Sequence, residues 1–266
     1  IMVALSNFAD LVRTAIAEKA DIIFAGAGMP LNLPSFLQKD STTKLVPIVS
    51  SGRAAKLICE KWKSIYNYLP DALVVEGPKA GGHLGFSRKQ LEEKMDYDME
   101  ISEILKLVRV YEKKAERKIP VAVGGGICDK ARAEHEFMLG ADLIQVASRF
   151  ITTKECDADS AYKDAYLKAQ KEDIVLVSSP VGMPGRAIRN PFLEHVEKGE
   201  VQRPQKCFGC LKHCNPAEIP YCITEALIHA VKGDTENGLL FCGAQGFLAN
   251  QIETVQDVME DLLGGL

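Results

Sequence analysis

A histidine in a glycine-rich loop is the first candidate for chemistry in this 266-residue chain. The loop runs from Glu76 to Gly85, contains Gly81 and Gly82, and places His83 just after the apolar stretch 72–76. Histidine exchanges a proton near neutral pH, and the neighbouring glycines leave room for a flat ligand against the backbone. The pattern indicates a general base; a histidine that only hydrogen-bonds within its loop is the alternative.

A second candidate is a run of three glycines, Gly124, Gly125 and Gly126, directly after the apolar stretch 120–123. About 20 residues later a second apolar stretch, 143–146, ends in the small residues Ala147 and Ser148. Glycines let backbone N–H groups approach a ligand without a Cβ in the way. Two neighbouring loops of this kind beside a helix N-terminus predict a phosphate site. Simple tight turns are the alternative.

Four of the eight cysteines crowd into 16 residues: Cys207, Cys210, Cys214 and Cys222. Four thiols at short spacing, with His213 beside them, could hold a structural Zn²⁺ or an iron–sulfur centre. The spacing matches neither the paired zinc pattern nor the ferredoxin run, so reduced thiols packed in a loop-rich segment are the other interpretation.

These residues need a scaffold, and the chain predicts one built from alternating strands and helices. Apolar, β-branched stretches suited to strands lie at 2–5, 21–24, 45–49, 72–76, 120–123 and 143–146. Helical spacing of apolar residues fills the segments near 8–16, 54–62 and 101–111. Strands that alternate with helices form a parallel sheet.

The loops favour a (β/α)8 TIM barrel over a doubly wound sheet. Almost every predicted strand ends in small or polar residues, such as Ser50-Ser51-Gly52 and Gly124-Gly125-Gly126. In a barrel all these strand ends meet on one face and build the site together, whereas a doubly wound sheet uses one or two loops.

Composition excludes several other classes. Hydrophobic residues make up 47% and charged residues 26% of the chain, with a net charge of −4. This balance shows no excess of positive charge of the kind that binds nucleic acid or an anionic membrane. No stretch is long and apolar enough to span a bilayer. Without a secretory signal, the cysteines are expected to be reduced in the cytoplasm.

The regular alternation of predicted strands and helices ends at about residue 172. Segment 173–203 is rich in loops and prolines, and helical stretches near 223–231 and 255–263 follow the cysteines. We therefore expect a β/α barrel at 1–172 that carries the ligand site, and a C-terminal cover with the cysteine-rich segment at 173–266.

Taken together, these motifs resemble the nitronate monooxygenase (2-nitropropane dioxygenase-like) family, which is similar to the flavin-dependent enoyl-acyl carrier protein reductase II enzymes. The resemblance covers residues 26–30, 47–51, 76–85, 124–127 and 140–150, and the tail motif 179–186 resembles a subset of the family. It implies an FMN-binding barrel that oxidises nitroalkanes or nitronates with O2 to carbonyl compounds and nitrite. The implied partners are a small-molecule substrate and O2, with a homodimer as a further expectation.

The resemblance also implies residue roles. His83 matches the catalytic base of the family. The positions implied for the cofactor are Glu76, Gly81, Gly124, Gly125, Gly126, Gln145, Ala147 and Ser148.

This chain departs from the family pattern at two points. It has Ala147-Ser148-Arg149 where the family usually has Gly-Thr-Arg. Counting strands back from 143–146 as the eighth makes 2–5 the third, so we expect the first two barrel strands to be absent.

Three functions remain open at this point. The first is FMN-dependent nitronate oxidation, and the second is an FMN- and NAD(P)H-dependent reductase acting on enoyl-acyl carrier protein. Arg88, Lys89 and Lys94 could guide an acidic carrier, but the acidic residues between and after them favour a solvated helix start. The third is a flavin- or phosphate-binding module without turnover.

Overall fold

The computed structural model describes residues 1–93, 95–204 and 206–265. Its contacts divide the chain into two compact units that interleave along the sequence. Unit 1 contains residues 1–77, 94–124 and 135–145, and unit 2 contains residues 78–93, 125–134 and 146–266. The predicted division into 1–172 and 173–266 stays a prediction.

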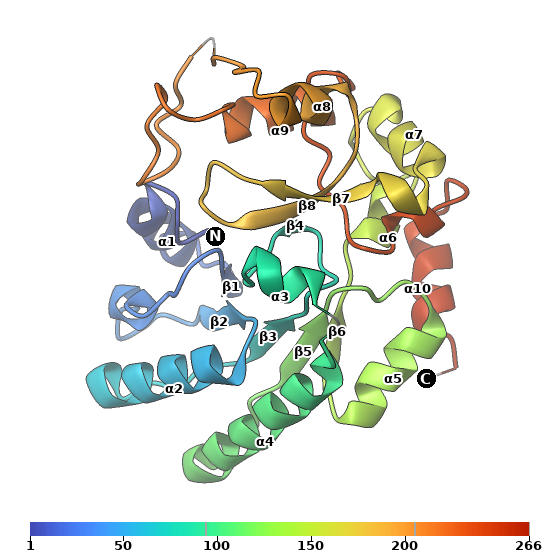
Figure 1. The fold of residues 1–266 in the computed structure, drawn as a ribbon. Helices are drawn as coiled ribbons and strands as arrows, with labels where there is room; N and C mark the ends of the chain where they lie inside the picture. Colours follow the sequence, from blue (N-terminus) through green and yellow to red (C-terminus); the bar gives the residue numbers. More distant parts are fainter. Residues whose placement is uncertain (94, 205, 266) are drawn as a thin grey trace. The chain divides into compact units, whose positions relative to one another are not determined.

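Unit 1 is organised around a five-stranded parallel sheet with the strand order β1-β2-β3-β5-β6 (Figure 1). Its strands are β1 (Ile22–Ala25), β2 (Lys44–Val49), β3 (Leu73–Glu76), β5 (Val121–Gly124) and β6 (Leu143–Gln145). Consecutive strands pair with their sequence neighbours in the sheet, and Glu76 lies opposite Gly124 while Gly124 lies opposite Gln145. This order brings the carboxyl ends of β3, β5 and β6 to one edge of the sheet.

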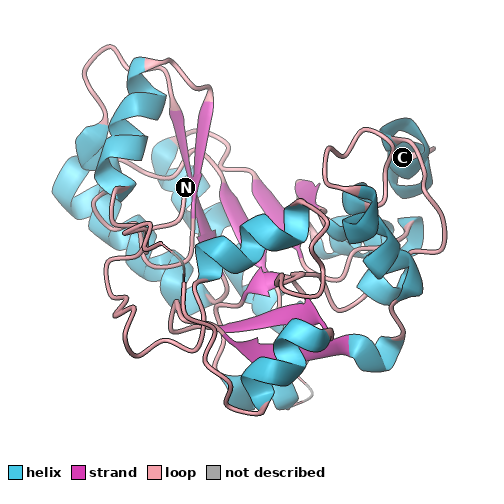
Figure 2. Cartoon of the chain, turned by 90° about the horizontal axis from the view of Figure 1, so that it is seen from above, coloured by secondary structure: helices cyan, strands magenta, loops and turns pink. Residues whose placement is uncertain are grey.

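The strands of unit 1 are apolar on both faces, which suits a parallel sheet covered by helices. Leu73, Val74 and Val75 of β3 are all buried. Helix α1 (Phe8–Ala17) precedes β1. Between the strands of the sheet lie the 3-10 turn η1 (Leu33–Phe36), α2 (Gly52–Tyr66), α4 (Tyr97–Ala115) and α5 (Lys130–Leu139), whose first residues belong to unit 2. Figure 2 shows the strands and these helices in a second view.

The ends of α2 illustrate how the sequence sets these boundaries. The Oγ of Ser51 accepts a hydrogen bond from the N–H of Ala54 at 3.3 Å, an N-cap of the kind that contributes about 1 kcal/mol. The helix ends at Asn67, which takes the left-handed conformation with φ +50°. Asparagine tolerates that conformation better than most residues, so the chain turns toward β3 there.

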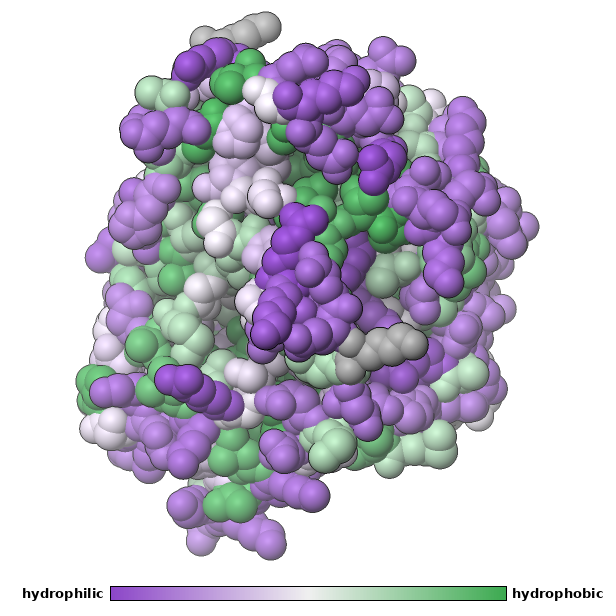
Figure 3. All heavy atoms as spheres, in the orientation of Figure 1, coloured by the Kyte–Doolittle hydropathy of each residue, from purple (hydrophilic) through white to green (hydrophobic). Residues whose placement is uncertain are grey.

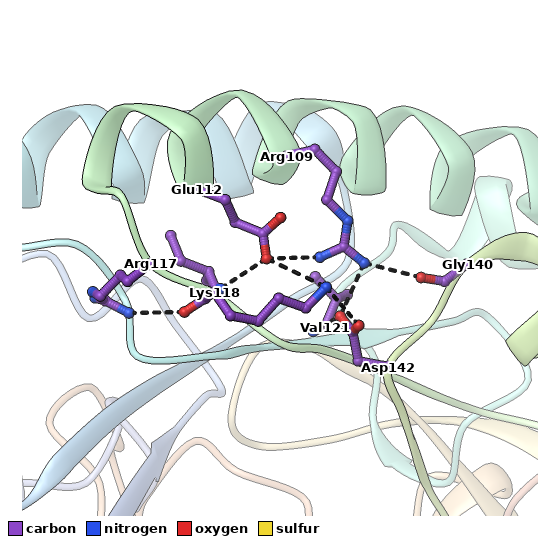
Figure 4. A network of polar contacts seen from close by, with 8 residues as sticks. Arg109, Glu112, Arg117, Lys118, Val121, Gly140 and Asp142 are labelled. Atoms are coloured by element: carbon purple, nitrogen blue, oxygen red, sulfur yellow. Dashed lines mark hydrogen bonds and ion pairs between the residues drawn. The ribbon is translucent and has the colours of Figure 1, made fainter.

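The amino-terminal edge of the sheet is held by a network of ion pairs (Figure 4). Arg109 donates to Glu112 and Asp142 at 2.9 and 3.0 Å, and Lys118 lies 2.8 Å from Asp142. Burial alone would raise the pKa of Asp142, but bonds from Lys118, the Val121 N–H and Arg109 lower it. The network ties α4 to β5 and to the turn before β6.

Unit 2 contains a three-stranded sheet with the order β4-β8-β7. Its strands are β4 (Gly82–His83), β7 (Ile174–Ser178) and β8 (Pro184–Ile188), and all are antiparallel. Helices and 3-10 turns surround this sheet: α3 (Arg88–Glu92), α6 (Ser148–Ile151), α7 (Ser160–Lys168), η2 (Lys171–Asp173), α8 (Pro191–Glu197), α9 (Ile223–Val231), η3 (Gly246–Leu248) and α10 (Val255–Leu263). One buried cluster joins Val177 and Ala187 of the strands to Phe192, Tyr221 and Leu239.

The structure confirms the predicted alternation of strands and helices with a parallel sheet, and two expectations need correction. Residues 2–5 do not form a strand; Met2 makes a single parallel bridge to Gly26. Segment 173–203 is not mainly loop, because it contains β7, β8 and α8. Two of its three prolines stand at the start of an element: Pro184 begins β8, and Pro191 occupies the first turn of α8, where its missing N–H costs nothing. Pro180 lies in the turn between β7 and β8.

On the face drawn in Figure 3, hydrophilic side chains predominate and hydrophobic ones lie between them. Within the described ranges, no helix combines the length and the apolar character needed to cross a membrane.

Candidate functional site

His83 is held in unit 2 by a two-residue strand. Gly82 and His83 of β4 pair with Arg186 and Gly185 of β8, and the N–H of Leu84 donates to the carbonyl of Pro184 at 2.8 Å. Gly82 has φ +68°, a conformation that favours glycine, and a Cβ added there would meet no atom within 4 Å. The backbone at Gly82 and His83 is therefore held by its pairing with β8, and the space beside the Cα of Gly82 is unoccupied by protein atoms.

The ring of His83 contacts the hydroxyl of Ser179, with 2.7 Å between Nε2 and Oγ. Ser179 is 8% exposed, and its Oγ also accepts the N–H of Val181 at 3.3 Å. Among the described residues, Nδ1 of His83 makes no hydrogen bond. If Nε2–H donates to Ser179, the lone pair of Nδ1 is available to accept a proton.

Apolar surroundings weaken the basicity of this ring. The ring of Phe241 packs edge-on against His83 with 4.9 Å between centroids. Burial lowers the pKa of His83 from the ordinary value of 6.5, because the charged imidazolium is poorly solvated there. The ring is consequently neutral at pH 7, which is the form that a general base needs.

Arg186 lies behind the histidine loop and is 8% exposed. Its guanidinium donates to the carbonyl of Ala80, and its own carbonyl accepts the N–H of Cys242 at 3.1 Å. Burial lowers the pKa of Arg186, and in the described part of the chain no carboxylate pairs with it. One residue thus links the loop at 80–83, strand β8 and the segment at 241–243.

Ser148 also belongs to this part of unit 2. Its Oγ accepts the N–H of Gly243 at 2.9 Å, and the N–H of Ala244 donates to the carbonyl of Lys79 at 3.0 Å. A Cβ on Gly81 would lie 2.5 Å from the carbonyl carbon of Cys242, so only glycine fits there. The structure therefore brings the predicted residues Gly81 and Ser148 to the same segment, 242–244.

Gly125 and Gly126 provide a test of whether a phosphate fits. Both have positive φ, +105° and +83°, and both are partly exposed. Their N–H groups find no hydrogen-bond acceptor among the residues the structure describes. Successive N–H groups without acceptors in a glycine turn after a strand are available to donate to an anion, so this pair suits the phosphate of a flavin mononucleotide. Ala147, exposed, precedes α6 at its N-cap position.

In unit 1, three predicted residues lie on adjacent strands at the carboxyl edge of the sheet: Glu76, Gly124 and Gln145. A Cβ on Gly124 would lie 3.1 Å from the Cβ of Gln145, which explains a glycine at this position. Burial raises the pKa of Glu76 to about 7. The side chain therefore gains or loses a proton near neutral pH.

The four clustered cysteines are free thiols, and their exposure differs. Cys207 is exposed, Cys210 and Cys214 are partly buried, and Cys222 is buried at the N-cap of α9. In the ranges described, no three side chains of His, Cys, Asp or Glu are arranged to hold a metal ion. Zinc and iron–sulfur binding by these cysteines stay predictions.

The charged stretch after the histidine loop forms solvated ion pairs. Arg88 pairs with Glu92 at 3.1 Å and Lys89 with Glu93 at 3.9 Å along α3, as the solvated-helix interpretation predicts. Lys94 lies outside the described residues.

Sequence reasoning missed Arg186 and the contact of Ser179 with His83. Both residues fall within the tail motif 179–186, but nothing in the sequence indicates that this motif reaches the loop at 80–83. Ser179 is 96 residues from His83, and the pairing of β4 with β8 brings the two segments together.

Comparisons with known proteins agree with this arrangement. A curated protein named "Probable nitronate monooxygenase" from Staphylococcus aureus is 30% identical over 134 residues, which are 50% of this chain and 36% of that protein. The match thus spans little more than a third of the length of the relative.

Two solved structures share the fold. FabK from Thermotoga maritima is 26% identical, with a TM-score of 0.73 over 99% of this chain and 73% of FabK. The nitroalkane oxidase from Streptomyces ansochromogenes has a TM-score of 0.69 at 19% identity, over 94% of this chain and 66% of that protein. The family model for nitronate monooxygenase matches residues 2–265. The chain therefore belongs to the nitronate monooxygenase family.

Proposed function

We propose that this protein is an FMN-dependent oxidoreductase that converts alkyl nitronates or nitroalkanes and O2 to carbonyl compounds and nitrite. The observation that carries this proposal is the contact between His83 and Ser179 on a glycine-rich loop, with Nδ1 left without a partner among the described residues. Membership of the nitronate monooxygenase family supports it.

In the proposed reaction, His83 removes the acidic proton on the carbon beside a nitro group. Nε2–H donates to Ser179 and Nδ1 accepts the substrate proton, so the ring becomes an imidazolium next to a newly formed nitronate anion. The positive charge then holds the nitronate. When nitronate itself is the substrate, the same ring only binds the anion. Proton transfer by a positioned base contributes about 10²–10⁴ in rate.

The residues that would hold FMN divide by the part of the cofactor they suit. The N–H groups of Gly125 and Gly126 suit its phosphate, and Ala147 and Ser148 are assigned to the same group. Glu76 and Gly81 are assigned to the flavin ring or ribityl chain by resemblance to the family, and Gly124 and Gln145 are assigned to the cofactor without a particular part of it. When bound, FMN supplies the electron transfer from nitronate and the reduction of O2.

The test is to mix the purified flavoprotein with substrates in the absence of oxygen. Bleaching of the flavin absorbance by a nitronate such as propyl-2-nitronate, but not by NADH, supports the proposal. Admission of O2 should then restore the absorbance and release nitrite. Absence of bleaching by the nitronate contradicts it.

A second candidate function is reduction of enoyl-acyl carrier protein. The observation in its favour is the 26% identity to FabK, an enoyl-ACP reductase II, over nearly the whole chain. Flavin bleaching by NADH or NADPH, followed by reoxidation with an enoyl thioester, would support this reaction instead. A flavin-binding module without turnover would be bleached by neither reductant.

We also propose that the five parallel strands are part of a (β/α)8 barrel. Their order, in which each strand pairs with the next parallel strand along the chain, is the order that a barrel wall requires. We further propose that the protein is cytoplasmic and forms a homodimer.

A further inference from the structure

A basic cavity of about 420 Å³ opens at the amino-terminal edge of the parallel sheet in unit 1. We define it by the cations Lys44, Lys63, Lys114 and Arg117, which lie in its wall. Lys44 begins β2, and Arg117 precedes β5. The predicted flavin residues of unit 1 stand at the opposite, carboxyl edge of the same strands. This cavity is therefore separate from the site at that edge.

Its positive charge is only partly neutralised. Asp71 is the one carboxylate in the described wall, and it lies 3.9 Å from Lys44 and 4.0 Å from Arg117. Asp71 is further occupied by the N–H of Leu45 at 2.8 Å and by the hydroxyl of Tyr68. Lys63 and Lys114 have no carboxylate partner among the described residues; Lys63 donates to the Asn67 side chain at 2.8 Å.

Neighbouring groups do not cancel the remaining charge. The carboxyl ends of α2 and α4 lie at this cavity, and each contributes roughly half a negative charge through its dipole. That leaves about two positive charges in excess. The nearby carboxylates of Glu112 and Asp142 are taken by Arg109 and Lys118. Besides Asp71, Arg117 contacts backbone carbonyls, those of Lys118 (Figure 4), Leu69 and Pro70.

Two hydroxyls in the wall have a proton to donate. Thr43 is 3% exposed, and its hydroxyl has no hydrogen-bond partner in the part of the chain that the structure describes. Ser41 accepts the N–H of Gln38 at 2.9 Å, which leaves its own O–H free to donate. The hydroxyl oxygen of Thr43 is not among the fully buried side-chain atoms without a partner, so it keeps access to the cavity and can donate its proton to an acceptor oxygen of a ligand. Ammonium and hydroxyl donors around one space are the set that binds a phosphate.

A second cavity of about 530 Å³, the apolar cavity, adjoins the basic cavity and takes its apolar surface from Leu57, Leu69 and Tyr111. The two cavities share Lys63, Leu69 and Lys114, and Glu60, Lys61 and Ser64 also line the second one. The Nζ of Lys114 lies 5.6 Å from the ring centre of Tyr111, so a cation stands at the border between the two spaces. A ligand that occupies both must carry an anionic group at one end and an apolar or aromatic group at the other.

We propose that these joined cavities form a second ligand site, which binds a small organic phosphate. Its phosphate lies between Lys63, Lys114 and the hydroxyl of Thr43, and its apolar part lies against Leu57 and Tyr111. The site is independent of the proposed oxidation of nitronates, and no residue assigned to FMN contributes to it.

The experiment measures binding to the FMN-saturated protein by isothermal titration calorimetry at low salt. The probes are pyrophosphate for the anion, adenosine for the ring, and ADP for both together. ADP should bind saturably and more tightly than pyrophosphate, and adenosine should bind most weakly. Equal affinity of ADP and pyrophosphate would overturn the proposed contribution of the apolar cavity. Lack of saturable binding by both would overturn the site.

Matched charge variants test the location. The double variant Lys63→Gln/Lys114→Gln should weaken ADP binding at least about tenfold, since two charge-assisted contacts are lost. The control is Arg53→Gln/Lys106→Gln, which removes the same charge from exposed positions of the same helices that are outside both cavities. An equal loss in the control would contradict the assignment. Thr43→Val keeps the shape of a buried side chain and should weaken ADP and pyrophosphate alike.

Discussion

The Nε2 of His83 and the Oγ of Ser179 lie 2.7 Å apart, although 96 residues separate them in the chain. Ser179 also accepts a backbone N–H from Val181, so its oxygen is already oriented before the histidine contacts it. A neutral histidine has one protonated nitrogen, and the group bonded to that nitrogen decides which one remains basic. In the proposed tautomer, in which Nε2–H donates to Ser179, this contact leaves Nδ1 of His83 to take the proton.

Replacement of His83 should abolish the proposed proton transfer. We expect His83→Asn to lower nitroalkane turnover by a factor of about 10²–10⁴, because asparagine cannot accept a proton. The measurement is steady-state nitrite release. His195→Asn, which changes an exposed histidine on α8, is the matched control and should retain full activity. Undiminished turnover in His83→Asn would refute the role of a base.

The pH dependence should follow the lowered pKa of His83. Activity toward nitroalkanes should fall as the pH drops through the pKa of the folded protein, which lies below 6.5. The free energy of unfolding should also fall as the pH drops below 6.5, because the unfolded chain binds this proton more readily than the folded protein. Ser179→Ala removes an acceptor that favours the imidazolium and should move the acid limb of kcat/KM to lower pH. A limb that moves upward would contradict this arrangement.

Gly126 and Gly182 have the same φ of +83°, so alanine variants of the two distinguish a loss of ligand binding from the effect of backbone strain. Gly126→Ala and Gly182→Ala should each cost roughly 1–2 kcal/mol in stability. Only the first should weaken FMN binding, by about tenfold or more, because its Cβ would lie 2.9 Å from the Lys79 side chain and distort the free N–H groups. A Cβ at Gly182 meets no atom within 4 Å. Fluorescence titration with FMN checks this, and equal losses would argue against a phosphate at Gly126.

Glu76 should destabilise the flavin-free protein at neutral pH. Its pKa rises from 4.5 to about 7 on folding, so ionisation favours the unfolded chain increasingly between these values. Glu76→Gln removes this effect. The variant should gain on the order of 2–3 kcal/mol over the parent at pH 8 and little at pH 4.5. Urea unfolding at several pH values measures the gain, and a gain that is the same at every pH would show that burial of Glu76 is not the cause.

The parallel sheet could be predicted from sequence because each of its strands is a short run of apolar residues between turn residues. Local composition carries that information, and the helices at 223–231 and 255–263 were predicted at their observed bounds for the same reason. The sheet of unit 2 could not be predicted in this way. β4 has only two residues, and β8 contains Pro184 and Gly185, which are rare in strands.

For the candidate site, the sequence indicated the residues that carry their own signal, a histidine among glycines and three glycines after a strand. It did not indicate Arg186 as a support for that loop. A buried arginine is expected beside a carboxylate, and this one is anchored by backbone carbonyls and strand pairing that no sequence pattern reveals.

The pairing of Gly82 with Arg186 and of His83 with Gly185 has a consequence for how this region can vary. Successive residues of a strand point to opposite faces, so a shift by one residue would turn the imidazole away from Ser179. The length of the turn between β7 and β8, residues 179–183, sets where Ser179 lies relative to β8, the strand with which His83 pairs. Single-residue insertions or deletions in this turn should therefore be tolerated far less than substitutions, even though the turn is distant in sequence from the histidine that Ser179 contacts.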